Sequence, residues 1–194
     1  MEEVLSWAER YAEEARATGG ELGLGGGPFE LCPVQGPVRF ADDFGAPRYA
    51  GGFHLHAGID ILAPLGTPVV APFPGTAVEA RGALGGLAVT VYGEEGYVYN
   101  AHLARIGALG PVGPGTVIGY VGNTGDAAGG PAHDHFEWHP GVIPADLPVS
   151  PYGQSLIGTA VDPYPYLTEV CARSVSEGGI RTVPTPPILR GASA

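Results

Sequence analysis

The sequence predicts an all-β domain, built as an antiparallel sandwich or barrel, and two observations carry that prediction. Short segments of apolar or alternating residues follow one another at close spacing along the middle of the chain. Glycine (33 residues) and proline (20 residues) together make 53 of the 194 residues, and many of them separate these segments as turns. The apolar segments argue against the disorder that such a composition can otherwise indicate.

Six segments are expected to form strands. They run over residues 68–71, 76–81, 87–92, 97–102, 117–121 and 133–139. The third segment is apolar on both faces except at Thr90, as a central buried strand is. Residues 93–96 (Gly-Glu-Glu-Gly) predict a hairpin loop after it. Shorter extended pieces are expected at residues 38–40 and 59–62.

Charge and composition exclude several classes of partner. The net charge is −11, and all nine basic residues are arginines scattered along the chain. Such a chain is not expected to bind nucleic acid or an anionic membrane surface. It holds no run of about 18 apolar residues, so no membrane span is expected. The first residues, Met1-Glu2-Glu3, lack the basic and apolar regions of a secretory signal peptide.

The segment 131–138 (PAHDHFEW) places two histidines two residues apart in an expected strand. Residues i and i+2 of a strand face the same side. His133 and His135 are therefore expected to point together into one space, while Asp134 and Phe136 face the other way. An isolated His-x-His is a weak motif, and a pair of surface or hydrogen-bonded histidines is the alternative.

Two other segments supply further candidate ligands. His56 and Asp60 lie four residues apart where Gly58 disfavours a helix and the following residues predict a strand. His102 stands at the end of the strand 97–102. Imidazole and carboxylate groups are good zinc ligands, and a catalytic zinc uses three of them and leaves one position to water. The chain thus has enough groups for such a site, with two to spare for acid–base chemistry.

The ordered motifs resemble those of the lysostaphin and LytM-type zinc metallopeptidases, which cut peptide cross-links in bacterial cell walls. They are His56-x-x-x-Asp60, the run ending in Asn100-Ala101-His102, and His133-x-His135-Phe136-Glu137. The resemblance covers roughly residues 28–171. It implies that His56, Asp60 and His135 bind Zn²⁺, and that His102 and His133 are catalytic. It also implies an antiparallel sandwich, a barrel-sandwich hybrid, with an open active-site groove.

The resemblance further implies the substrate, peptidoglycan stem peptides or cross-bridges, and an extracytoplasmic location, secreted or cell-wall associated. A monomer is expected. One alternative is a non-catalytic module of the same family that binds and activates a cell-wall amidase, although such relatives generally lack a ligand. A zinc-stabilised structural module or a phage lytic component is a further alternative.

Strand alternation also predicts the faces of the strand 97–102. Val98, Asn100 and His102 share one face, which we expect to line the groove, while Tyr97 and Tyr99 pack on the other face.

The residue between His133 and His135 departs from the family pattern. Asp134 stands where the resembled family usually has an apolar residue. A buried unpaired carboxylate is costly, so Asp134 is expected to be partnered or solvated.

The chain is expected to divide into three parts. Residues 1–27 form an N-terminal helix and a glycine-rich linker, residues 28–173 the metallopeptidase domain, and residues 174–194 a flexible tail. Cys32 and Cys171, the two cysteines, bracket the domain, and a disulfide between them is favoured over two free thiols. A disulfide implies an oxidising compartment.

Overall fold

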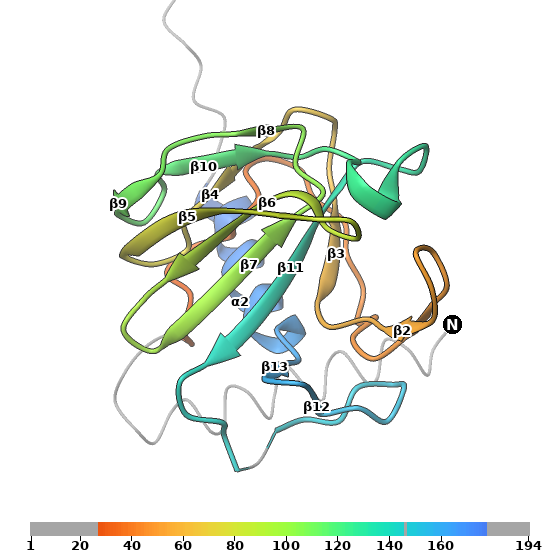
Figure 1. Cartoon of the computed structure of the whole chain (residues 1–194). Coiled ribbons are helices and arrows are strands. Elements are labelled where there is room, and N and C mark those ends of the chain that lie inside the picture. The colour runs from red at the N-terminus through yellow and green to blue at the C-terminus, as the bar shows by residue number, and fades with distance from the viewer. Residues whose placement is uncertain (1–26, 146, 178–194) are drawn as a thin grey trace, which may run out of the picture.

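The computed structural model describes residues 27–145 and 147–177, which fold as antiparallel sheets with one α-helix (Figure 1). The strands are β1 (Pro47–Arg48), β2 (His54–Leu55), β3 (Ile59–Leu62), β4 (Pro68–Val70), β5 (Gly75–Gly82), β6 (Gly86–Tyr92), β7 (Gly96–Ala101), β8 (Arg105–Ile106), β9 (Gly110–Val112), β10 (Val117–Tyr120), β11 (His133–Pro140), β12 (Leu156–Ile157) and β13 (Ala160–Val161). The helices are the 3-10 turn η1 (Gly125–Ala127) and α2 (Tyr164–Glu177). The expected N-terminal helix lies outside the described residues.

The largest sheet has the strand order β12-β13-β11-β7-β6-β5-β9, and β3 joins it by pairing with β11. A three-stranded sheet (β4-β10-β8) lies across one end of it, and β1 and β2 form a small hairpin (Figure 1). Every pairing among the described strands is antiparallel and these strands close no barrel, so the predicted fold class is confirmed. The expected strand at 38–40 is reduced to one bridge between Arg39 and Leu62.

Strand β11 has one face toward the core and the other toward the outside of the sheet. Its residues alternate between buried and half-buried positions, as the period of a strand requires. Phe136 and Trp138 point into the core, where both pack edge to face against the buried ring of Phe29, at 5.2 and 5.5 Å between ring centroids. His133 and His135 therefore lie on the outer face, as the sequence predicts.

Helix α2 was not predicted from the sequence. It begins at Tyr164 between Pro163 and Pro165, two residues of a type that favours extended chain or a turn. The structure tolerates proline there because the first turn of a helix leaves its amides without intrahelical acceptors. Leu167 and Val170 are buried against the sheet, and Figure 1 shows the helix behind it. No helix among the described residues is long and apolar enough to cross a membrane.

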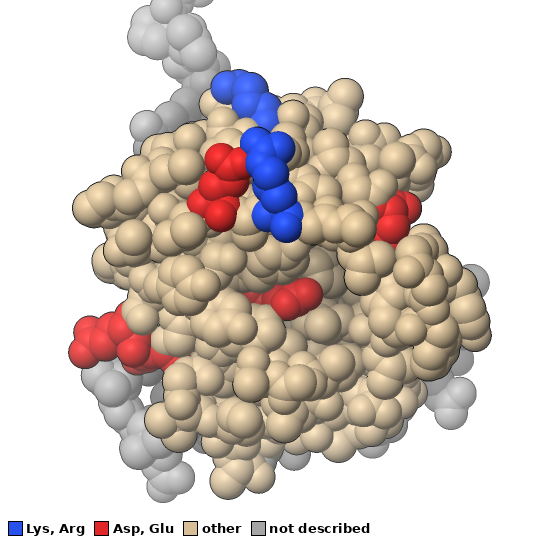
Figure 2. Space-filling model, in the orientation of Figure 1, with Lys and Arg blue, Asp and Glu red and all other residues tan. Residues whose placement is uncertain are grey.

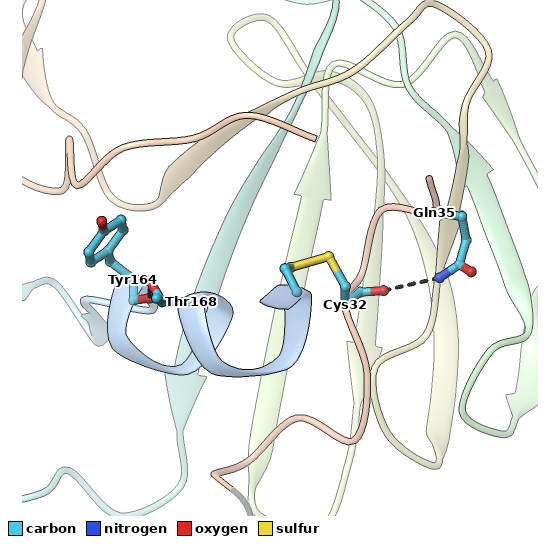
Figure 3. The surroundings of a disulfide bond; sticks show 5 residues. Cys32, Gln35, Tyr164 and Thr168 are labelled. Atoms are coloured by element: carbon cyan, nitrogen blue, oxygen red, sulfur yellow. Dashed lines mark hydrogen bonds between the residues drawn. A yellow bond between two sulfur atoms is a disulfide. The ribbon is translucent and has the colours of Figure 1, made fainter. Parts of the chain in front are cut away.

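The expected disulfide is present: Cys32 is bonded to Cys171, 139 residues later. Figure 3 shows how it ties α2 to the segment that enters the domain. Both cysteines are buried. The start and the end of the domain are thus joined covalently at the back of the sheet.

A buried carboxyl at the start of α2 makes the stability depend on pH. Asp162, 2 % exposed, accepts a hydrogen bond from the Tyr164 amide, and burial together with the charge of Asp42 raises its pKa to about 7. A raised carboxyl pKa adds stability that is present below the unfolded value near 3.8 and is lost as the pH rises to about 7.

We therefore expect Asp162→Asn, which keeps the acceptor oxygen, to remove this loss. Relative to the variant, the wild type should lose roughly 2–3 kcal/mol of unfolding free energy between pH 5 and pH 8. Urea unfolding of both proteins at the two pH values measures it. If the difference in unfolding free energy between the two proteins did not change with pH, Asp162 would not be the source of the pH dependence.

Candidate metal centre

Three side chains converge on one point of the outer face. The Nε2 atom of His56 lies 2.9 Å from Oδ1 of Asp60 and 2.8 Å from Nδ1 of His135. The same Asp60 oxygen lies 3.3 Å from His135 Nδ1. All three atoms lie within 4.8 Å of one another, and residues 27–145 and 147–177 hold no other such group of His, Cys, Asp or Glu. These are the three residues for which the resemblance to the zinc metallopeptidases implies a role as metal ligands.

Strand pairing brings them together. β3 runs antiparallel to β11 with Asp60 directly opposite His135, so the two side chains leave the same face of the sheet. Gly58 makes the close approach possible, because a Cβ there would lie 2.3 Å from the carbonyl oxygen of Phe136. His56, two residues earlier, turns its ring to the same point.

The outward ring nitrogen of each candidate ligand histidine faces an oxygen acceptor. Nδ1 of His56 lies 3.0 Å from the carbonyl oxygen of Asp43, and Nε2 of His135 lies 2.8 Å from Oε1 of Glu137. A histidine that donates from one ring nitrogen keeps its lone pair on the other. In their neutral forms, which metal binding requires, His56 and His135 would thus direct the lone pairs of Nε2 and Nδ1 to the centre beside the Asp60 carboxylate. Two neutral imidazoles and one carboxylate fit a zinc ion, and metal-binding histidines are oriented in this way.

Two more histidines stand beside these three. The rings of His102 and His133 lie 4.9 Å apart between centroids, and His133 Nε2 lies 3.6 Å from Oδ1 of Asp60. In both, Nδ1 donates to a backbone carbonyl at 2.9 Å, of Thr124 for His102 and of Pro131 for His133. Nε2 of each ring is therefore left as a proton acceptor. The structure brings all five predicted site residues into one cluster.

The face assignment of strand β7 was wrong. Val98 and Asn100 are fully buried in the core, not in the groove. Tyr97 and Tyr99 lie on the outer face instead: the ring of Tyr97 stacks on that of His139 at 4.3 Å, and the ring of Tyr99 lies 6.4 Å from that of His135.

A single backbone conformation explains the error. His102 has φ of 58°, the one positive φ among the described non-glycine residues. Its amide donates to the Gly85 carbonyl, and its own carbonyl accepts from the Thr124 amide, which hold the turn. Strand alternation stops at this left-handed residue. The His102 ring is therefore found beside His133 and His135, although alternation from Asn100 would place it in the core.

The electrostatics of the cluster favour positive charge at its centre. Burial lowers the pKa of His135, but hydrogen bonds to Asp60 and Glu137 outweigh burial and raise it to about 10. Burial raises the pKa of Asp60, but its hydrogen bonds to His135 and His56 outweigh burial and hold it well below the usual range. Figure 2 shows the face hollowed at its middle, with acidic side chains in the hollow. The anionic groups thus suit a bound cation.

His102 differs from its neighbours. Burial, followed by the positive charge of His135, lowers its pKa. Its ring is therefore neutral at neutral pH, which is the form that can accept a proton.

The sequence reasoning missed a chain of contacts behind His135. Glu137 accepts from His135 Nε2 through Oε1 and from His139 Nε2 through Oε2, both at 2.8 Å. The other nitrogen of His139 lies 2.8 Å from the Thr159 hydroxyl. The available signal was alternation, because residues 133, 135, 137 and 139 share one face of β11.

We expect Glu137→Ala to weaken zinc binding by about 10- to 100-fold, because His135 loses the acceptor that fixes its ring. Competition with a chromogenic chelator measures the zinc dissociation constant. The control is Glu79→Ala, an exposed glutamate position on β5 that pairs with Arg81. Equal zinc affinity in the two variants would show that Glu137 does not orient the ligand.

The expectation for Asp134 was also wrong. The residue is 0 % exposed, and neither carboxylate oxygen has a hydrogen-bond partner among the described residues. Burial raises the pKa of Asp134 well above its usual range. Asp134 lies on the core face of β11, paired with the buried Ile61 of β3, and a buried carboxyl without a partner is expected to destabilise the core.

Asp134→Leu is accordingly expected to raise the free energy of unfolding by about 1–3 kcal/mol at neutral pH. Urea denaturation of the metal-free proteins checks this. Glu94→Leu, in the exposed β6–β7 loop, is the control and should change stability by less than about 0.5 kcal/mol. A destabilised Asp134→Leu would mean that the carboxyl has a stabilising role at this position.

Comparison with known protein families gives one match over half of the chain. The sequence model of Peptidase family M23 matches residues 54–151. The L-Ala--D-Glu endopeptidase of Bacillus subtilis is 32 % identical over 158 residues, which are 76 % of this chain and 45 % of that protein. The DD-carboxypeptidase/endopeptidase Mpg of Neisseria meningitidis is 42 % identical over 89 residues, 44 % of this chain and 20 % of Mpg. The chain thus spans less than half the length of these relatives.

Solved structures show the same fold. LytU is 28 % identical and superposes with a TM-score of 0.54. The match covers 72 % of this chain and 92 % of the LytU chain. The catalytic domain of lysostaphin from Staphylococcus simulans is 27 % identical, with a TM-score of 0.51. The match covers 68 % of this chain and 92 % of the lysostaphin domain.

Proposed function

We propose that this chain, which belongs to peptidase family M23, is a zinc-dependent endopeptidase that hydrolyses peptide bonds of bacterial peptidoglycan. The observation that carries the proposal is the convergence of His56, Asp60 and His135. Beside them, two further histidines have a ring nitrogen left free.

His56 Nε2, Asp60 Oδ1 and His135 Nδ1 are the atoms that would hold the zinc ion. A zinc ion with three protein ligands lowers the pKa of a bound water molecule and polarises a carbonyl oxygen. The charge of the site fits this role, because Asp60 stays ionised over the whole physiological range of pH.

His133 is the proposed general base. Its Nε2 atom faces the centre, 3.6 Å from Asp60 Oδ1, and can accept the proton of the attacking water. The Nδ1 contact to the Pro131 carbonyl is kept whether or not Nε2 is protonated, so the ring need not move. Asp60 lies close enough to stabilise the imidazolium that forms.

His102 is the proposed second catalytic histidine, which acts as a proton donor. Its neutral ring also keeps its Nδ1 bond, to the Thr124 carbonyl, while Nε2 takes up or releases a proton. In the protonated form Nε2 can donate to the developing oxyanion or to the leaving amine.

The family supports the proposed substrate class and location. Peptidase names such as L-Ala--D-Glu endopeptidase support stem peptides or cross-bridges as the substrate of this chain. The buried disulfide supports an extracytoplasmic location, in which such a bond persists. We propose that the chain acts there as a monomer.

A digest tests the proposal. Zinc-loaded protein is incubated with purified cross-linked peptidoglycan, with and without a zinc chelator, and released fragments are identified by mass spectrometry. We expect chelator-sensitive release of peptides that carry a new amino terminus, and their masses name the bond. An intact wall after treatment with protein shown to hold zinc would instead favour the amidase-activating module.

A further inference from the structure

We propose that Arg48 is a positioning residue that turns one oxygen of Asp60 away from the metal and leaves the other as the single ligand atom. This inference rests on the proposed function, because it presumes a metal at the three converging residues. It concerns a residue that belongs neither to the predicted ligands nor to the predicted catalytic histidines.

The contacts of one guanidinium nitrogen carry the inference. Arg48 Nη2 lies 2.6 Å from Oδ2 of Asp43 and 3.0 Å from Oδ2 of Asp60. The second Asp60 oxygen, Oδ1, is the one that faces the centre, 2.9 Å from His56 Nε2. One carboxylate is thus shared between the guanidinium and the ligand cluster.

The number of hydrogens on Nη2 supports this arrangement. Nη2 has two hydrogens, and the carboxylates of Asp43 and Asp60 take both. Nη2 also lies 3.0 Å from Nδ1 of His56, but it has no third hydrogen to donate there. The Nδ1 hydrogen of His56 is then directed to the oxygens of Asp43, the carbonyl at 3.0 Å and Oδ1 at 3.3 Å, so a neutral His56 has its lone pair on Nε2. Arg48 therefore fits the ligand-ready form of both His56 and Asp60.

The consequence concerns the number of coordinating oxygens. Carboxylates bind metals with one oxygen or with two. A second Asp60 oxygen would take the position that a catalytic zinc leaves to water. The guanidinium opposes this, because it holds Oδ2 by a charge-assisted hydrogen bond in a partly buried pair with side-chain exposures of 30 % and 23 %.

Removing Arg48 should therefore affect the coordination more than the affinity. In Arg48→Met we expect the zinc dissociation constant to change by less than about 10-fold, while kcat for peptidoglycan falls by about 10- to 100-fold. Protein loaded with Co²⁺ in place of zinc should show a weaker visible absorption band, because the band loses intensity when the coordination number rises above four. Arg48→Lys, which keeps one cationic donor, should recover part of the intensity and of kcat.

The control is Arg39→Met, an exposed arginine whose backbone bridges Leu62. It should match the wild type in both readouts. An unchanged cobalt spectrum and an unchanged kcat in Arg48→Met would overturn the inference alone. The inference would also be overturned if a folded Arg48→Lys variant showed no recovery of the cobalt band intensity or of kcat relative to Arg48→Met. A wild-type protein that binds Co²⁺ no better than His56→Ala would instead overturn the proposed metal site and the function built on it.

Discussion

Replacing His133 with alanine is expected to lower peptidoglycan hydrolysis by about 10²- to 10⁴-fold while zinc stays bound. The ring contributes Nε2 as a proton acceptor near Asp60 but is not one of the three converging ligands. Initial rates of fragment release, together with the zinc content of the purified variant, measure both parts of the prediction.

Two companion variants make this result specific. His54→Ala changes a histidine whose ring contacts the Gly52 carbonyl, and it should keep nearly normal rates and zinc. His56→Ala removes a ligand and should lose zinc as well as activity. Near-normal turnover in His133→Ala would show that the base is another group. Loss of zinc in His133→Ala would place this residue among the ligands.

Removing the disulfide is expected to have the largest effect on stability. Cys32 and Cys171 close a loop with a sequence separation of 139, for which the chain-entropy model gives up to about 5 kcal/mol. The bond also fixes α2 against the back of the sheet, where Leu167 and Val170 are buried (Figure 3). The double variant Cys32→Ser, Cys171→Ser should therefore unfold at a much lower urea concentration.

Comparison with and without reductant separates the bond from the serine substitutions. Reductant should destabilise the wild type and leave the double variant unchanged. If the reduced wild type lost less than about 1 kcal/mol, the entropic constraint of the loop would not be what stabilises the domain.

Much of this protein could be predicted from its sequence because the relevant patterns are local. The alternation in residues 133–139 set two histidines on one face of a strand, and the structure places them there. Apolar segments separated by Gly-rich turns gave the strands at residues 87–92 and 97–102, which the structure contains as β6 and most of β7. The two cysteines that bracket the domain indicated its disulfide.

Other features depended on contacts between segments far apart in the chain. The left-handed turn at His102 reverses the expected faces of β7, and it is held by backbone bonds to Gly85 and Thr124. Burial of Asp134 depends on the pairing of β11 with β3, which sets this residue opposite the buried Ile61, and no local pattern encodes that pairing.

The same limit applies to the groups around the ligands. Arg48 of β1 contacts Asp60 of β3 although the two strands belong to different sheets. Helix α2 forms despite Pro165 in its first turn because Leu167 and Val170 are buried in the core. The sequence by itself therefore determined which chemical groups the site contains and the faces of β11. Tertiary structure alone decided how those groups are oriented, because hydrogen-bond partners and backbone turns are fixed by long-range packing.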